Sequence, residues 1–355
     1  MTTVAITGVG GFIGRGLVRA LDEHAEVDRV VGVDLVAPRR VNATKLVFRQ
    51  ADVRDRDLAE AFANVDVVVH LAFRLDPMHD ESTMHEINVE GTKRVFEAAA
   101  AAGVGRVVYL SSVAAYGAHA DNDVPLTEDS PVRGTPEFNY SQHKAEIEQW
   151  LPGWQGDHPD VRVTVLRPAI VLGPGVQNFV TRAFESPRVT LVRGHKPPLQ
   201  FVHLDDIVSA LVHVLDHDLD GVYNVTAEGW LSMDEVTAIV GRRTVAVPEE
   251  VAFSVAERLW RLGIGEQPPG LVSHFMHPWV ASPEKLLATG WQPRHSNRDA
   301  LAEMVTEHGR FVALAGLRAE RRTVRSASLA AIGVVAVTAA REVRRRQQRQ
   351  RRAAR

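Results

Sequence analysis

Tyr140 and Lys144 have the residue types and the spacing of a proton-transfer site. They stand four positions apart in a segment, 140–154, that we expect to form a helix, so both side chains fall on one face. A phenol with a pKa of about 10 is a poor base at neutral pH. A neighbouring ammonium stabilises the phenolate and lowers that pKa, as does a positively charged nicotinamide. Tyr140 could then exchange a proton with a substrate hydroxyl while the nicotinamide takes or gives a hydride.

Two serines add a hydroxyl to this chemistry. Ser111 and Ser112 come at the end of a β-branched run from 106, which we expect to be a strand. A hydroxyl at that strand end can reach the same substrate oxygen as Tyr140. By themselves, Tyr140 and Lys144 also fit a half-exposed tyrosine beside a surface lysine. The serines favour the catalytic interpretation.

A glycine turn near the start of the chain independently predicts the cofactor that this chemistry needs. Gly8, Gly11 and Gly14 follow the β-branched run 3–6 and lead into a segment, 12–24, with helical apolar spacing. A strand, a glycine turn and a helix in this order form a dinucleotide-binding fingerprint. We expect Gly8 to make the tight turn, Gly11 to admit the pyrophosphate and Gly14 to let helix and strand pack closely. The helix N-terminus would supply partial positive charge. An ordinary glycine-rich turn is the alternative.

Asp34 is the residue that we expect to select the cofactor. It ends the second predicted strand, 30–34, and stands 26 positions after Gly8. A carboxylate at about this distance meets the adenosine ribose hydroxyls and disfavours a 2′-phosphate, so NAD is favoured. Arg39 and Arg40 follow closely and would favour a phosphate, which leaves NADP open. A strand-end turn residue is the alternative for Asp34.

Strand-like and helix-like segments alternate through the first half of the chain. Further strands are expected at 45–49, 66–72 and 161–166, and a long helix at 82–102. Such alternation predicts an α/β fold with a Rossmann doubly wound parallel sheet.

After Pro168 the pattern becomes irregular and predicts a smaller substrate-binding cap. Short strands are expected at 201–204 and 222–225, and helices at 205–215, 249–262 and 297–314. Ser232 and Glu235 form a capping box that begins another helix. We assign 1–172 and 201–226 to the NAD(P)-binding Rossmann domain. The cap takes 173–200 and 227–315, and 316–355 forms an apolar helix and an Arg-rich tail.

Composition narrows the class of protein. The 355 residues include no cysteine, which excludes disulfides, thiolate metal ligands and a cysteine nucleophile. The first strand follows Met1 so closely that we expect no signal peptide and a cytoplasmic location. The formal net charge is −3, although positions 341–355 hold eight arginines and one glutamate. The acidic remainder argues against nucleic acid as a partner. The fifteen histidines show no metal-ligand spacing, so no metal site is expected.

The C-terminal end allows three interpretations. Residues 326–340 are uncharged and mostly apolar, and Arg325 and Arg341 bound them. As a helix of about 22 Å they would be shorter than the hydrocarbon core of about 30 Å. Peripheral membrane contact is slightly favoured, because arginines suit an anionic surface. Packing on the body or on a partner subunit, or a disordered basic tail, are the alternatives.

Several motifs together resemble those of one family, the NAD-dependent epimerase/dehydratase family of extended short-chain dehydrogenases/reductases. The matching stretches run from Thr7 to about Asn224 in the family's order. They are Thr7–Gly14, Ala51–Val53, His70–Ala72, Ser111–Gly117, Arg167–Pro168 with Gly173–Pro174, and Phe201–Asp206.

The resemblance implies roles for particular residues. Ser112 would polarise the substrate oxygen, Tyr140 would be the acid/base, and Lys144 would lower its pKa and bind the nicotinamide ribose. In this family the pair Asp205–Asp206 mainly caps a helix and braces the domain junction, and His203 would be a packed residue. The cofactor contacts implied by fingerprint and resemblance are Gly8, Gly11, Phe12, Ile13, Gly14, Asp34, Asp52, Val53, Leu71, Ala72, Ser111, Tyr140, Lys144 and Pro168. The resemblance also implies a homodimer as an option.

Leu199 departs from the family pattern. Nucleotide-sugar enzymes of the family usually carry an arginine here, two residues before Phe201, to hold the substrate diphosphate. An apolar side chain cannot neutralise a phosphate. Arg193 and Lys196 are nearby cations that would have to take its place. The departure leaves room for a smaller or more apolar alcohol or ketone.

The main functional hypothesis is an NAD(P)-dependent oxidoreductase that moves a hydride between nicotinamide and a secondary alcohol or ketone. A nucleotide-sugar epimerase or dehydratase with tightly bound NAD is the alternative within the enzyme class. A non-catalytic NAD(P)-binding regulatory protein is the alternative from another class. The intact set of Ser112, Tyr140 and Lys144 argues against that last hypothesis. In each case the partner is a small molecule.

Overall fold

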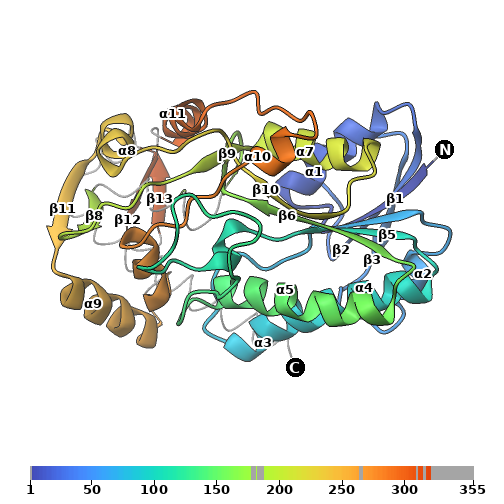
Figure 1. Ribbon diagram of the computed structural model, residues 1–355, viewed down its shortest axis with the longest axis horizontal. Coiled ribbons are helices and arrows are strands. Elements are labelled where there is room, and N and C mark those ends of the chain that lie inside the picture. Colours follow the sequence, from blue (N-terminus) through green and yellow to red (C-terminus); the bar gives the residue numbers. More distant parts are fainter. Residues whose placement is uncertain are drawn as a thin grey trace.

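The computed structural model describes residues 2–176, 181, 188–263, 267–308, 311–314 and 317–320. Figure 1 shows two layers of helices around a sheet on one side and a smaller group of helices and short strands on the other. The cavity analysed below lies where these two parts meet.

One seven-stranded sheet forms the centre of the larger part. Its order is β10-β6-β5-β4-β1-β2-β3, and every neighbouring pair is parallel. The strands are β1 (Thr2–Thr7), β2 (Val27–Asp34), β3 (Leu46–Gln50), β4 (Val67–His70), β5 (Arg106–Leu110), β6 (Arg162–Pro168) and β10 (Gly221–Val225). The order reverses between β1 and β4, and ligands of such sheets bind at the carboxyl ends beside that reversal. The predicted doubly wound fold is confirmed.

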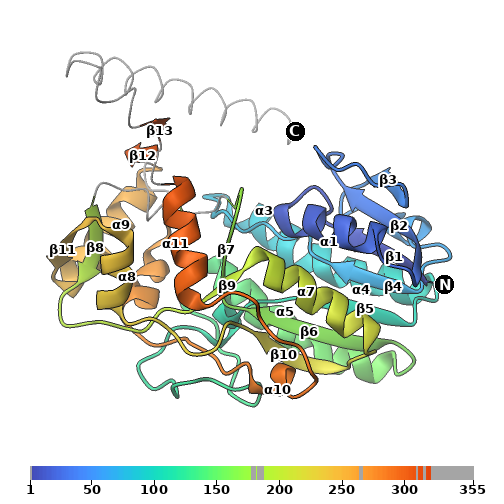
Figure 2. The same ribbon diagram turned by 90° about the horizontal axis from the view of Figure 1, so that it is seen from above.

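Helices cover both faces of this sheet because its strands are apolar on both sides. All four residues of β4 and all five of β5 are buried. On one face lie α1 (Phe12–Asp22) and α7 (Leu204–Asp216), which run side by side in Figure 2. On the other face lie α2 (Leu58–Ala61), α4 (Gly91–Ala101) and α5 (Asn139–Asp157). Each layer has its own cluster of buried side chains.

The long helix expected at 82–102 is interrupted. It consists of α3 (Glu81–His85), a π-helical turn at Glu86–Glu90 and α4. Such turns concentrate at functional sites. Within this one, Asn88 accepts a hydrogen bond from the Arg74 amide (2.7 Å) and donates one to the Arg74 carbonyl (3.1 Å). The π-turn therefore fixes the loop that follows β4.

The smaller part has its own apolar cluster, built around Phe201, Leu231 and Leu301. Its strands form two parallel pairs, β7 (Ile170–Leu172) with β9 (Phe201–His203) and β8 (Arg188–Val192) with β11 (Arg243–Val247). Its helices are α8 (Met233–Val240), α9 (Glu249–Arg261) and α11 (Asn297–His308), whereas the short α10 (Glu284–Leu287) packs against β10 of the central sheet. Two 3₁₀ segments, Val113–Tyr116 and Pro269–Phe275, complete the elements near the junction. The predicted capping box of Ser232 and Glu235 is present at α8.

The helix predicted at 297–314 is too long. The structure ends α11 at His308, and Phe311–Leu314 forms a strand, β12, that pairs antiparallel with β13 (Leu317–Glu320). Gly309 favours a helix end, and the aromatic and β-branched pair Phe311–Val312 favours an extended backbone. The strand β13 lies at the start of the range 316–355, before the segment 326–340 for which the apolar helix is predicted.

The apolar segment 326–340 and the arginines after it lie outside the described residues. Membrane contact and the homodimer stay predictions. Among the residues that the structure describes, no helix has the length and apolar character needed to cross a membrane.

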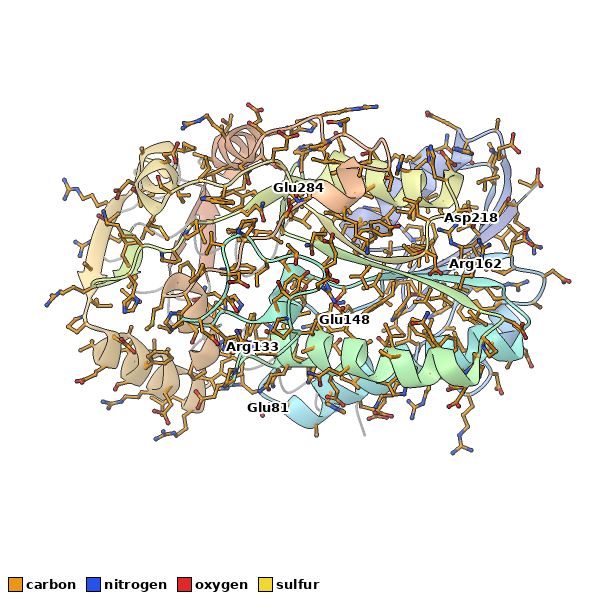
Figure 3. All side chains as sticks on the ribbon, in the orientation of Figure 1. Glu81, Arg133, Glu148, Arg162, Asp218 and Glu284 are labelled. Carbon is orange, nitrogen blue, oxygen red and sulfur yellow. The ribbon has the colours of Figure 1, made fainter. Side chains whose placement is uncertain are left out.

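A buried ion pair joins the elements that surround the site. Glu148, on α5, accepts hydrogen bonds from Arg167 Nε (2.8 Å) and Nη2 (2.5 Å), at the end of β6. Both side chains are about 5% exposed or less. Figure 3 shows Glu148 in the middle of the view, whereas the paired Arg162 and Asp218 lie toward the amino ends of the strands, where β6 begins.

The network continues on both sides of this pair. Ser111 donates a hydrogen bond to Glu148, and Arg167 donates one to the Tyr116 hydroxyl (2.7 Å). Tyr116 in turn donates to Asn224 at the end of β10 (2.8 Å). The ends of β5, β6 and β10 are therefore tied to α5 by one chain of buried polar contacts.

Replacing Glu148 by glutamine should destabilise the fold strongly, because it leaves the Arg167 guanidinium buried without a counter-charge. We expect the free energy of unfolding in urea to fall by about 3–5 kcal/mol. Lys93→Gln, which removes the partly exposed ion pair with Glu90, is the control and should cost less than about 1 kcal/mol. Equal losses in the two variants would contradict the role given to Glu148.

Candidate active site

A cavity of about 220 Å³ lies at the carboxyl ends of the central strands. One end is lined by the glycine turn and the other by side chains of the smaller part. The predicted residues that line it are Gly8, Gly11, Phe12, Ile13, Gly14, Leu71, Ser111, Ser112, Tyr140, Lys144 and Pro168. The structure thus brings together residues that are up to 160 positions apart in the chain. Asp34, Asp52, Val53 and Ala72 were also predicted, and they are not among its lining residues.

The glycine turn has the shape that the fingerprint requires. Gly8 has a φ of +73°, and a Cβ there would lie 2.7 Å from the Ala72 nitrogen. A Cβ on Gly14 would lie 2.5 Å from the Gly8 carbonyl oxygen. Gly11 is the N-cap of α1 and offers no side chain to its first amides, and the first turn holds no acidic residue. The exposed amides and the helix dipole fit a diphosphate group.

Asp34 lies beside this turn and braces it. Its Oδ2 accepts a hydrogen bond from the Gly10 amide (2.9 Å), and its Oδ1 accepts one from the Val36 amide (3.3 Å). The carboxylate is partly exposed and keeps acceptor capacity for ribose hydroxyls. Arg39 and Arg40 are exposed. The geometry is therefore compatible with the expected binding of the adenosine ribose by Asp34, and it shows that Asp34 also braces the glycine turn.

The other three residues outside the lining hold neighbouring loops. Asp52 forms an ion pair with Arg54 (2.7 Å), and the Arg54 hydrogen bond lowers the pKa of Asp52 despite partial burial. Val53 packs against Gly91, since a Cβ added to Gly91 would lie 2.8 Å from Val53 Cγ2. The Ala72 amide donates to Thr7 Oγ1 (3.3 Å).

Ser112 and Tyr140 meet within the cavity. Burial raises the pKa of Tyr140 to about 12, and a hydrogen bond with Ser112 lowers it by less. Burial acts in this direction because a phenolate is poorly solvated among apolar side chains. The lowering expected from Lys144 and a positively charged nicotinamide stays a prediction. Ser112 Oγ also accepts from the Ala114 amide (3.1 Å), which fixes the hydroxyl at the end of β5.

Lys144 is buried one helical turn from Tyr140, and its ammonium is directed elsewhere. It donates to the Leu110 carbonyl (2.7 Å) and to the Tyr109 hydroxyl (3.2 Å), and it lies 3.5 Å from the centre of the Phe73 ring. Burial lowers the pKa of Lys144 well below its usual value, while the charge of Glu148 opposes that effect.

Sequence reasoning missed several lining residues. Phe73 packs edge-on against Tyr140, with ring centres 5.5 Å apart, and helps to hold the acid/base candidate in place. No short motif marks such residues, because they come from separate strands, 3₁₀ segments and loops. They are Phe73, Leu75, Leu110, Ala114, Phe138, Ala169, Ile170, Val171, Gln267, Leu271, His274, Phe275 and Trp279.

Leu199 lines the cavity too. It is buried, and paired backbone hydrogen bonds with Leu231 fix its position. Arg193 is exposed, and Lys196 forms an ion pair with Asp234 (2.9 Å). Neither cation lines the cavity.

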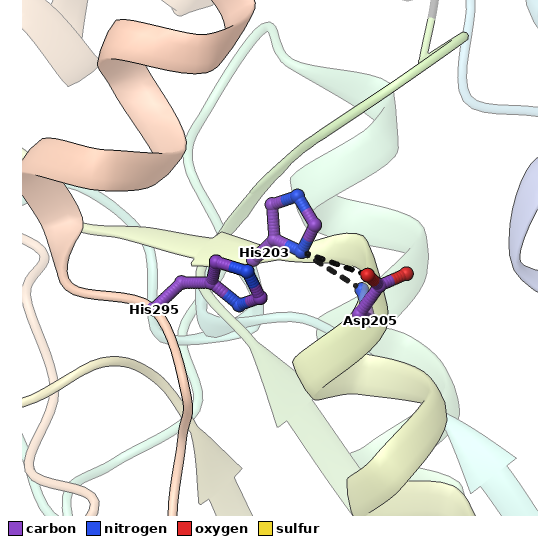
Figure 4. Close-up of side chains that lie close together, drawn as sticks. All are labelled: His203, Asp205 and His295. Carbon is purple, nitrogen blue, oxygen red and sulfur yellow. Dashed lines mark hydrogen bonds and ion pairs between the residues drawn. The ribbon is translucent and has the colours of Figure 1, made fainter.

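The structure also assembles one group of metal-ligand side chains within the residues it describes. His203, Asp205 and His295 place ligand atoms within 4.8 Å of one another, and Figure 4 shows His203 directed at Asp205. Sequence spacing missed this group because His295 is distant in the chain.

The hydrogen bonds made by His203, Asp205 and their neighbours hold helices and loops together. His203 Nδ1 accepts from the Asp205 amide (3.1 Å) and so caps α7, while its Nε2 contacts Glu303 (3.0 Å) on α11. Asp206 accepts from the amides of Arg294 (2.8 Å) and His295 (3.1 Å). The capping residue is therefore His203, and Asp206 braces the junction.

Comparison with known proteins supports an enzyme family for this chain. Residues 4–226 match the model of the "NAD dependent epimerase/dehydratase family". An uncharacterized protein of Mycobacterium tuberculosis is 31% identical over 255 residues, covering 69% of this chain and 67% of that protein. A UDP-glucose 4-epimerase of Mycolicibacterium smegmatis is 30% identical, covering 84% of this chain and 96% of that protein.

Solved structures agree with the family in fold. The UDP-glucose 4-epimerase of Thermus thermophilus, in complex with NAD, has a TM-score of 0.67 at 23% identity, covering 87% of this chain and 99% of that one. MoeE5 in complex with UDP-glucose and NAD has a TM-score of 0.65 at 25% identity, covering 87% and 98%. The predicted resemblance is confirmed: the chain belongs to the NAD-dependent epimerase/dehydratase family, an enzyme family of the extended short-chain dehydrogenase/reductase type.

Proposed function

We propose that this protein transfers a hydride between NAD and a secondary alcohol or ketone, with Tyr140, Lys144 and Ser112 as its catalytic residues. The observation that carries the proposal is one cavity lined by all three of these side chains and by the glycine turn. Family membership and the NAD named in related structures support the cofactor.

The cofactor, when bound, supplies the hydride acceptor or donor. Gly8, Gly11 and Gly14 would hold its diphosphate, and Asp34 its adenosine ribose. Tyr140 is protonated in the described state. In ketone reduction it would be the general acid that gives a proton to the substrate oxygen, and in alcohol oxidation its phenolate would be the base that takes the hydroxyl proton. Ser112 shares that oxygen by hydrogen bonding. Lys144 would have to turn from the Leu110 carbonyl to donate toward the ribose, and the charge of Glu148 favours its protonated form.

A nucleotide-sugar epimerase is the second candidate. The relative from Mycolicibacterium smegmatis carries that name and aligns over most of both chains. Epimerisation and net oxidation use the same hydride transfer, and they differ in whether NADH accumulates. The apolar Leu199 at the cavity favours the oxidoreductase.

Tyr140→Phe should lower kcat for NADH formation from a secondary alcohol by about 10²–10⁴-fold, because the variant has no phenol oxygen to take the hydroxyl proton as the hydride leaves. The measurement is NADH absorbance under saturating NAD with a panel of secondary alcohols. The matched control is Tyr223→Phe, whose hydroxyl bonds the Asp220 carbonyl at the far end of β10. Comparable losses in both variants would remove Tyr140 from the mechanism.

The four tyrosines should ionise late in the folded protein. Burial raises the pKa of Tyr116 and Tyr140 to about 12 and that of Tyr109 and Tyr223 above the usual value. Ultraviolet titration at pH 10 should show little tyrosinate until guanidinium unfolds the chain, when about half ionises. The folded pKa values are the raised ones, so this stabilisation is complete below about pH 10 and is lost as the pH rises through about 12. Substantial tyrosinate in the folded protein at pH 10 would contradict the burial of these phenols.

Calorimetric titration should show tighter binding of NAD⁺ than of NADP⁺, by about tenfold or more. Asp34 would accept the ribose hydroxyls and repel a 2′-phosphate. Asp34→Asn keeps an acceptor for the Gly10 amide but loses the negative charge. The variant should therefore show a smaller difference between its affinities for NAD⁺ and NADP⁺. A preference for NADP⁺ in the unaltered protein would instead assign the selection to Arg39 or Arg40.

A further inference from the structure

We propose that Phe73 is a positioning residue of the reaction, whose ring keeps the buried ammonium of Lys144 charged beside Tyr140. This role rests on the proposed function, in which Tyr140 exchanges a proton with the substrate oxygen. Phe73 acts through Lys144, by a contact of its ring.

The ring of Phe73 contacts both of the catalytic side chains that α5 contributes. The nitrogen of Lys144 lies 3.5 Å from the centre of this ring, and the Tyr140 ring stands nearly perpendicular to it, with 5.5 Å between the ring centres. The face of an aromatic ring carries partial negative charge, so it attracts a cation placed over it. Phe73 also lines the cavity. One ring therefore joins the candidate acid/base to its cation.

Burial makes the charge of Lys144 costly. The residue is 2% exposed, and desolvation lowers the pKa of its ammonium well below the usual value. The charge of Glu148 opposes this effect, but that carboxylate is already bonded to Arg167. An ammonium in such a place is more stable when further groups around it favour the positive charge. The face of an aromatic ring at 3.5 Å is a group of this kind.

The hydrogen bonds of Lys144 leave room for the ring. An ammonium has three N–H donors. Two of them have oxygen partners, the Leu110 carbonyl (2.7 Å) and the Tyr109 hydroxyl (3.2 Å). The ring of Tyr109 is farther from the nitrogen than that of Phe73, at 4.7 Å from its centre. The Phe73 ring is therefore the closest aromatic partner of this cation.

The backbone on both sides of Phe73 is held by hydrogen bonds. The Ala72 amide donates to Thr7 Oγ1 (3.3 Å), and Asn88 bonds both the amide and the carbonyl of Arg74 (2.7 and 3.1 Å). Thr7 belongs to β1 and Asn88 to the π-turn before α4. The sheet and the helix layer therefore both fix the loop that carries the ring.

The other titratable groups around Lys144 add no free charge near neutral pH. Burial lowers the pKa of His70 on β4 to about 3 and that of His143 on α5 to about 4. Burial also raises the pKa of the Tyr109 phenol on β5 well above its usual value. The carboxylate of Glu148 is held in its buried ion pair. The proton of Lys144 is therefore the one that the aromatic contact affects.

Loss of the ring should favour the neutral amine. An uncharged Lys144 gives no electrostatic help to the Tyr140 phenolate, which alcohol oxidation needs as its base. NADH formation should then require a higher pH. The charge acts across space, so this consequence holds whether or not the ammonium turns toward the ribose.

The first measurement is nuclear magnetic resonance of the full-length protein with carbon-13 at the ε-carbons of lysine. The signal of Lys144 is identified by its absence from Lys144→Met. Protons over an aromatic face are shielded, so the ε-protons of Lys144 should resonate upfield of those of the exposed Lys196. In Phe73→Leu this displacement should be lost, and the pKa of Lys144 should fall by roughly 0.5 to 1.5.

Three further variants separate the ring face from packing. Phe73→Tyr keeps the face and should retain both the upfield signal and the pKa of Lys144. Phe73→Met removes the face with a more flexible apolar side chain and should resemble Phe73→Leu. Phe96→Leu is the matched control, because Phe96 packs against Tyr109 (6.2 Å between ring centres) and is not one of the described lining residues. It should leave the Lys144 signal and pKa unchanged.

The second measurement is the pH profile of NADH formation with the panel of secondary alcohols. In Phe73→Leu the rising limb should move to higher pH, and kcat at pH 7 should fall by roughly three- to tenfold. The KM for NAD⁺ should change little. Phe73→Tyr and Phe96→Leu should both keep the profile of the unaltered protein.

Two results would overturn the role of Phe73 even in a protein whose NADH formation depends on Tyr140. One is a Lys144 pKa that is equal in Phe73→Leu and in the unaltered protein. The other is a lowered Lys144 pKa with an unmoved pH profile. If instead Tyr140→Phe leaves NADH formation unchanged, the mechanism under Proposed function fails, and the resonance measurements still decide whether Phe73 keeps Lys144 charged.

Discussion

The buried charge of Glu148 is the constraint on which the site depends. It must be matched by Arg167, since an isolated carboxylate is expensive in an apolar interior. The match holds α5 against the ends of β5 and β6, and through Tyr116 and Asn224 it reaches β10. Lys144 stands one helical turn before Glu148, so the same charge opposes the loss of its proton. One interaction thus sets both the position and the charge of the groups beneath the cavity.

The cavity has two ends with different chemistry. The end at the glycine turn presents backbone amides and a helix N-terminus, which suit a charged, diphosphate-containing cofactor. The other end presents aromatic and aliphatic side chains with one neutral imidazole. Tyr140 and Ser112 lie with Lys144 among these walls. This division is what a hydride-transfer enzyme needs when its second reactant is largely apolar.

The match to the family model covers the two ends of the cavity to different extents. The matched range, 4–226, contains the glycine turn, both serines, Tyr140 and Lys144. His274, Phe275 and Trp279 lie beyond it, in a segment that packs over the cavity from the smaller part. The match to the family model therefore covers the cofactor end of the cavity and does not reach these three residues of the substrate end.

The sequence by itself determined the parallel sheet, the glycine turn and the pairing of Tyr140 with Lys144, because each rests on local spacing. The spacing of apolar residues, the residue types of turns and the helical register each depend on a few neighbouring residues, so they can be read from the sequence without the tertiary structure. Contacts between distant segments do not, so only the tertiary structure joined His274 to Phe138 and Glu148 to Arg167. It also raises the pKa of Tyr140 by burial, because desolvation depends on everything that packs around the phenol. The π-turn at Glu86–Glu90, which contains Asn88, is likewise visible only in the structure.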